Sequence, residues 1–194
     1  MQSEVSMKKL HKIPFYSQHS QKDWQERGFK DLEEAKFWEN KSCGIACMKM
    51  VLDMHPEHGG KKFADLIQEM EEKGVYKAGI GCVHQGIADD FNARNIDSQR
   101  IKIDTPDQIK KFIDQDSIII VSIGPGFVEG RKSGHLVPLI GYKEESGKVT
   151  HIITHHTSSY LEWQWPEKEV EVETFMNHFS GNAIRVRLYD TIYP

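Results

Sequence analysis

The most reactive type of side chain in this sequence occurs three times, as Cys43, Cys47 and Cys82. Cys43 follows Ser42, a good helix N-cap residue, and precedes apolar residues at helical spacing, so it is expected in the first turn of a helix. A thiolate is favoured there, because unpaired backbone N–H groups and the positive end of the helix dipole face it. The glycine at position 44 leaves room for an approaching carbonyl group. Cys43 is therefore predicted to be a nucleophile with a lowered pKa. A small buried residue at the start of a helix is the alternative.

The other two cysteines are expected to pack in the interior. Cys47 lies one turn further along the same helix, on an apolar face, and Cys82 has no motif around it. A metal site formed by Cys43 and Cys47 is an alternative, but no second pair of ligands has finger-like spacing. An odd number of sparse cysteines does not describe a disulfide framework.

A thiolate nucleophile needs a base, and His135 is the best placed of the ten histidines. It directly follows the glycine-rich segment 124–134 and opens an apolar strand. We expect this position to hold the imidazole at the rim of a sheet. A structural role for the ring is the alternative.

Local patterns predict the elements that must position this pair. The first 40 residues are polar and irregular, and residues 1–12 are expected to be flexible. The periodicity predicts helices over about 43–54, 61–73, 83–94, 106–114 and 172–179, and strands over about 117–123, 135–143, 149–154 and 183–189. Helices come mostly before strands, which favours an α+β fold with a mainly antiparallel sheet. With no linker or repeat, residues 1–194 are expected to form a single domain.

Composition excludes several classes of protein. The chain has 194 residues, with 25 Lys and Arg against 29 Asp and Glu, and its net charge of −4 argues against a dedicated nucleic-acid binder. The longest apolar run, 118–123, is too short to cross a bilayer, and the N-terminus lacks the apolar region of a signal peptide. We expect a cytoplasmic protein that has no membrane partner and no cofactor. Its oligomeric state is not indicated.

Three segments carry a resemblance to a known family. They are Ile13-Pro14-Phe15-Tyr16-Ser17-Gln18, Ser42-Cys43-Gly44-Ile45-Ala46-Cys47-Met48-Lys49-Met50-Val51-Leu52 and Gly134-His135-Leu136-Val137-Pro138-Leu139-Ile140-Gly141-Tyr142. Their order and spacing resemble the peptidase C39-like family of papain-fold cysteine peptidases. The resemblance implies a papain-like fold. It spans most of the chain, from Ile13 to Phe175.

The resemblance implies roles for individual residues. Cys43 would attack a carbonyl carbon, and His135 would accept its proton and later donate it to the leaving group. Gln18 would donate a side-chain N–H to the oxyanion, with Gln21 as the fallback. The backbone N–H of Cys43 would be the second oxyanion donor.

The third catalytic position departs from the family pattern. An Asp or Asn usually follows the next strand there, but this chain has neither between Tyr142 and Asn177. By motif position, His156 takes the orienting place, with His155 next in line. A neutral histidine brings no negative charge to stabilise an imidazolium, so we expect a weaker ion pair and a slow, specialised or lost activity. A metal site at the two histidines is the alternative, although adjacent strand residues point to opposite faces.

Three functions follow from this reading. The first is a cysteine peptidase or amide hydrolase that forms an acyl-enzyme on Cys43. The second is an acyltransferase on the same scaffold, and the third is a catalytically silent peptide-binding module. The expected substrate is a peptide or another acyl or amide compound. The segment 124–134, Trp163 and Trp165 are expected to border the cleft.

Overall fold

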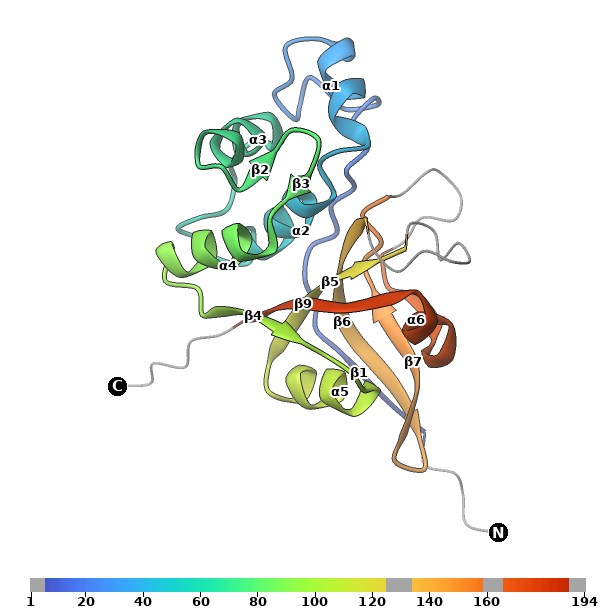
Figure 1. Ribbon diagram of the computed structural model, residues 1–194. Coiled ribbons are helices and arrows are strands. Elements are labelled where there is room, and N and C mark those ends of the chain that lie inside the picture. Colours follow the sequence, from blue (N-terminus) through green and yellow to red (C-terminus); the bar gives the residue numbers. More distant parts are fainter. Residues whose placement is uncertain (1–5, 125–133, 159–165, 189–194) are drawn as a thin grey trace.

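The described part of the chain forms short helices, one large antiparallel sheet and a separate two-stranded sheet (Figure 1). The computed structural model describes residues 6–124, 134–158 and 166–188. Its helices are α1 (Leu32–Glu39), α2 (Cys43–Leu52), α3 (Phe63–Glu72), α4 (His84–Ala93), α5 (Pro106–Asp114) and α6 (Val172–His178). Its strands are β1 (Ser6–Leu10), β2 (Tyr76–Lys77), β3 (Gly81–Cys82), β4 (Ser98–Lys102), β5 (Ser117–Ile123), β6 (His135–Glu145), β7 (Lys148–Thr154), β8 (Lys168–Glu171) and β9 (Phe179–Arg187).

Strand β6 is the centre of the large sheet, whose order is β4-β9-β5-β6-β7-β8. Strand β5 pairs with the first part of β6, from His135 to Leu139, and β1 pairs with the second part, from Gly141 to Glu145. Residues 6–10 were expected within a flexible segment and instead form β1. Their sequence is polar because this strand is exposed or half-buried along its length, so its apolar pattern is weak.

The sheet is covered on both faces, which explains its apolar sequence. In β5, Ile118 and Ile120 belong to the core that includes α2, α3 and α4, whereas the alternate residues Ile119, Val121 and Ile123 belong to the core beside α5 and α6. This period of two is the signature of a strand with two buried faces. The α+β plan with an antiparallel sheet is confirmed.

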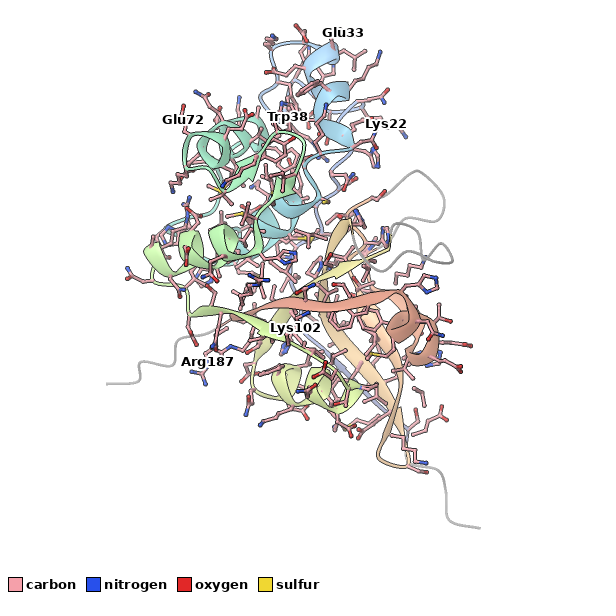
Figure 2. The ribbon with its side chains drawn as sticks, viewed as in Figure 1. Lys22, Glu33, Trp38, Glu72, Lys102 and Arg187 are labelled. Carbon is pink, nitrogen blue, oxygen red and sulfur yellow. The ribbon has the colours of Figure 1, made fainter. Side chains whose placement is uncertain are left out.

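Helix α2 lies between α3 and the sheet (Figure 1). Every residue from Gly44 to Leu52 is buried, and α2 packs against β6. Trp38 of α1, labelled in Figure 2, packs its ring edge-on against Tyr76 of β2, with the ring centroids 4.9 Å apart. In the described part of the chain, no helix is long and apolar enough to cross a membrane.

The boundaries of α5 and β5 agree with those expected from the sequence, whereas α1 was missed. Its sequence is mostly charged, and only Ala35, Trp38 and Glu39 are buried. A start signal was nevertheless present, because Asp31 accepts the Glu34 N–H at 2.8 Å as an N-cap should. The short strands β2, β3, β4 and β8 were also missed, because polar strands of this length carry little periodicity.

We predict that Gly141→Ala destabilises the fold, because a Cβ at this position would lie 2.3 Å from the backbone oxygen of Lys9. Strand β1 would have to move away from β6, and overpacking of this kind costs about 1–3 kcal/mol. Urea unfolding should show that loss. Glu145→Ala, at the exposed end of the same strand, is the control and should stay within about 0.5 kcal/mol of the wild type. Equal midpoints for both variants would contradict the close approach of the two strands.

Candidate active site

The junction between α1 and α2 fixes the position of Cys43. The backbone N–H groups of Lys41 and Ser42 donate to the Trp38 oxygen at 3.0 and 3.1 Å, and the Ser42 hydroxyl donates to the same oxygen at 2.9 Å. Ser42 is the N-cap residue of α2, as expected, but its side chain makes no cap hydrogen bond. The first N–H groups of α2 are therefore left to other acceptors.

The Cys43 sulfur is one of those acceptors. It receives hydrogen bonds from the backbone N–H groups of Gly44 in the first turn of α2 and of Leu136 in β6. Burial nevertheless raises the pKa of the Cys43 thiol, and the N–H groups only offset part of that rise. The expected lowering of this pKa is therefore wrong for the resting structure, because removal of solvent outweighs the helix terminus.

The space beside Gly44 is filled by protein. A Cβ at this position would lie 2.6 Å from the Cβ of Cys82 and 3.0 Å from a methyl group of Leu136. From the sequence, this space was expected to admit an approaching carbonyl group. In the structure, the missing side chain instead lets β3 and β6 approach the first turn of α2.

His135 opens β6, immediately before the residue that donates to the Cys43 sulfur. Its side chain is buried, with 5% of the residue exposed. Burial, together with smaller contributions from the neighbouring histidines His156 and His19, lowers the pKa of His135 to about 3. The structure thus places a neutral thiol and a neutral imidazole on adjoining segments of α2 and β6.

Thr157 determines which nitrogen of His135 carries the proton. The Thr157 hydroxyl donates its only hydrogen to the Leu136 oxygen at 2.9 Å, and it lies 3.2 Å from the His135 Nε2. The hydroxyl must therefore accept a hydrogen bond from Nε2–H, which leaves Nδ1 as the unprotonated nitrogen. Sequence reasoning missed Thr157, which is fully buried and directly follows the two candidate histidines.

His156 and His155 occupy different places from each other. The His156 ring lies beside that of His135, with centroids 4.9 Å apart and planes tilted by 35°. His156 therefore contacts the His135 ring, whereas Thr157 forms the hydrogen bond with Nε2. Burial lowers the pKa of His156 to about 4. His155 is in hydrogen-bond contact with the backbone of Ile13 and Glu167, away from His135. This divergence agrees with the alternation of side chains in an extended segment.

Gln18 lies close to Thr157 but does not line the cavity beside Cys43 and His135. Its backbone N–H donates to the backbone oxygen of Thr157 at 2.9 Å, and its side-chain amide donates to the backbone oxygen of Glu39. That bond uses one of the two amide hydrogens. The fallback residue, Gln21, is committed elsewhere, because its amide donates to the buried Glu39 carboxylate at 2.7 Å.

A cavity of about 490 Å³ opens at this point. Cys43, Cys82 and His135 line it, together with residues of the β2–β3 hairpin such as Ile80, whose side chain is exposed. Residues 125–133 and 159–165, which include Trp163, Trp165 and most of the expected cleft loop, lie outside the described residues. Among the described residues, no group of three or more His, Cys, Asp or Glu side chains is arranged to hold a metal ion.

Comparisons with known proteins agree on one family. The model of the Peptidase_C39 like family matches residues 10–182. No curated protein sequence matches the chain.

Solved structures of low sequence identity share the fold. A C39-like protein from Bacillus anthracis has 12% identity and a TM-score of 0.61, over 93% of this chain and 97% of that one. A double glycine motif protease from an AMS/PCAT transporter, in complex with the leader peptide, has 14% identity and a TM-score of 0.53, over 92% and 94%. The peptidase domain of Streptococcus ComA, a bi-functional ABC transporter involved in a quorum sensing pathway, has 15% identity and a TM-score of 0.50, over 76% and 92%. These likenesses confirm the papain-like α+β fold.

We predict that acid destabilises the fold through His135 and His156. An ordinary histidine in the unfolded chain titrates near pH 6.5, whereas the folded pKa values are about 3 and about 4. Below about pH 6.5 the unfolded state therefore binds protons that the folded state does not, and each such proton costs up to about 1.4 kcal/mol per pH unit. The free energy of unfolding should keep the full contribution of these histidines above pH 6.5 and should fall as the pH decreases towards 4.

Urea unfolding from pH 5 to 8 measures this effect, with His156→Asn as the test variant. Between pH 5 and 6, its free energy of unfolding should depend on pH by about 1 kcal/mol per unit less than that of the wild type. At pH 8 the two proteins should differ only by a constant, because neither state binds the proton. Parallel curves throughout the range would contradict the low pKa of His156.

Proposed function

The chain belongs to the peptidase C39-like family, and on that premise we propose that it is a cysteine peptidase that hydrolyses peptide bonds through a thioester on Cys43. The observation that carries this proposal is the contact between the Cys43 sulfur and the N–H of Leu136. It places the sulfur at the N-terminus of a buried helix and beside the strand that begins with His135. A nucleophile next to a base is the arrangement that acyl transfer requires.

The first step is attack on the substrate carbonyl. Because thiol and imidazole are both neutral at rest, the Cys43 proton moves to His135 Nδ1 as the sulfur bonds to the carbonyl carbon. The negative charge on the carbonyl oxygen is stabilised by the backbone N–H of Cys43 and by the second amide hydrogen of Gln18. The protonated imidazole then gives its proton to the leaving amine, and the acyl group remains on the sulfur as a thioester.

The second step releases the acid. Water takes the place of the amine and gives a proton to His135 Nδ1 as its oxygen attacks the thioester carbon. The C–S bond breaks, and the proton returns to the Cys43 sulfur. Each step needs the same nitrogen to be free of hydrogen at its start, and the bond from His135 Nε2 to Thr157 supports that tautomer.

We assign the orienting role to Thr157, with His156 packed against the ring. A hydroxyl oxygen accepts the Nε2–H and fixes the ring orientation, but it carries no charge. The imidazolium formed during attack is therefore less stabilised than it would be by a carboxylate. This arrangement favours a slow peptidase.

A peptide substrate fits the comparisons best. The double glycine motif protease with the same fold was solved in complex with a leader peptide. In the present chain, the cavity beside Cys43 is open to solvent and carries the exposed Ile80 at its rim. An extended peptide segment with an apolar side chain suits such a cleft.

Peptide cleavage with matched cysteine variants tests this function. The wild type should cleave members of a diverse peptide library detected by mass spectrometry, and a peptidyl acyloxymethyl ketone should label Cys43. Cys43→Ala should abolish both signals, because it removes the proposed nucleophile, whereas Cys47→Ala should keep both. Cleavage by Cys43→Ala would overturn the assignment of the nucleophile. Labelling without cleavage would overturn hydrolysis and favour an acyltransferase or a peptide-binding module.

Thr157 offers a second test within the same assay. Thr157→Val keeps the shape but removes the oxygen that accepts from His135 Nε2, and such a bond to a group that becomes charged is worth about 1.5–3 kcal/mol. We expect kcat to fall about 10- to 100-fold with little change in KM. Thr157→Ser retains the hydroxyl and should retain most of the activity. If both variants lost activity equally, or if KM alone changed, Thr157 would not be the orienting residue.

A further inference from the structure

A second thiol lies at the helix terminus that carries Cys43. Cys82 of β3 packs against the first turn of α2, where a Cβ on Gly44 would lie 2.7 Å from the Cys82 sulfur. The Ile45 N–H hydrogen-bonds the Cys82 sulfur, and the preceding N–H of the chain, that of Gly44, hydrogen-bonds the Cys43 sulfur. The two sulfurs thus accept hydrogen bonds from consecutive backbone N–H groups in one turn of α2.

Both thiols are accessible from the same side. Cys43 and Cys82 are half-buried and line the same cavity, whereas Cys47 is fully buried. A small oxidant that enters the cavity can therefore reach the first two sulfurs and is kept from the third. This contact was not expected from the sequence, which suggested only a packing role for Cys82.

We propose that Cys43 and Cys82 form a reversible disulfide when a hydroperoxide oxidises Cys43. The pairing goes beyond the proposed peptidase function and does not depend on it. In the disulfide, the Cys43 sulfur is bonded to the Cys82 sulfur and cannot form the thiolate that attacks a carbonyl. The same bond would protect Cys43 from irreversible oxidation by excess peroxide.

The reaction uses two thiols and one hydroperoxide. Cys43 gives its proton to His135, and its sulfur attacks the outer peroxide oxygen; the O–O bond breaks, and the alkoxide or hydroxide leaves with that proton. This leaves a sulfenic acid on Cys43. The Cys82 sulfur then attacks the Cys43 sulfur, the S–O bond breaks, and hydroxide leaves with the Cys82 proton as water. The two thiols are oxidised by two electrons in total, and the peroxide is reduced to alcohol and water.

The local backbone suits this bond. A disulfide needs its two Cβ atoms at about 3.8 Å, which demands a close approach of the two chain segments. The absence of a side chain at Gly44 allows that approach. Cys82 also ends a short hairpin that has Gly79 in its turn and Gly81 at the start of β3, both with positive φ, at 79° and 90°. Glycines tolerate the small rotations that would bring the sulfurs together.

Peptide mapping after peroxide treatment tests the proposal without any substrate. The full chain is treated with hydrogen peroxide at equimolar and higher ratios, free thiols are blocked with N-ethylmaleimide, and the protein is digested with trypsin. Cleavage after Lys41, Lys49, Lys77 and Arg94 yields peptides 42–49 and 78–94. We expect these peptides to be joined within one chain, with loss of two hydrogen atoms, and to separate with dithiothreitol.

Two variants make the assignment specific. Peptide 42–49 contains both Cys43 and Cys47, so the link must persist in Cys47→Ser. In Cys82→Ser, Cys43 should pass to the sulfinic acid at high peroxide and should not recover with dithiothreitol. A wild-type map without the linked peptides, or a link that disappears in Cys47→Ser, would overturn the proposal. Failure of peptide cleavage alone would overturn the peptidase function and leave this result intact.

Discussion

The contact between the first turn of α2 and the first residues of β6 is the constraint on which the rest of the site depends. It joins a helix from the N-terminal part of the chain to the central strand of the sheet, through the hydrogen bond from the Leu136 N–H to the Cys43 sulfur. The contact is possible because Gly44 has no side chain there. The two faces of the sheet are then buried separately, and β5 and β1 hold β6 along one edge.

Burial decides the charge state of the site. The helix terminus, which alone would favour a thiolate, is outweighed by removal of solvent, and the pKa of Cys43 is raised while that of His135 is lowered to about 3. Both groups are therefore neutral at rest. In the proposed mechanism, charge separation occurs only during attack, so catalysis would depend on donors aimed at the developing oxyanion and not on a preformed ion pair.

In the proposed mechanism, the Thr157 hydroxyl orients His135 where an Asp or Asn was expected. Its single hydrogen is committed to the Leu136 oxygen, so it can only accept from His135, which favours the tautomer that has its proton on Nε2. Unlike an Asp carboxylate, the hydroxyl would bring no negative charge to face the imidazolium in the proposed transition state. The family fold is thus compatible with an orienting residue that a search for Asp or Asn would not find.

The sequence by itself determined the α+β plan, most of the long elements, and the pairing of Cys43 with His135 as candidates, because these depend on local periodicity and on motifs within short segments. It could not determine α1 or β1, whose few apolar residues leave no clear period. Nor could it determine that Thr157, rather than a neighbouring histidine, meets Nε2, or that Cys82 meets the first turn of α2. The tertiary structure decided both contacts. For Thr157, a register shift between Leu139 and Gly141 sets how β7 and the residues after it align with β6, and a shift of one residue exchanges the side chains on the two faces. For Cys82, the packing of β3 against α2 brings its side chain to Gly44, where no side chain stands in the way.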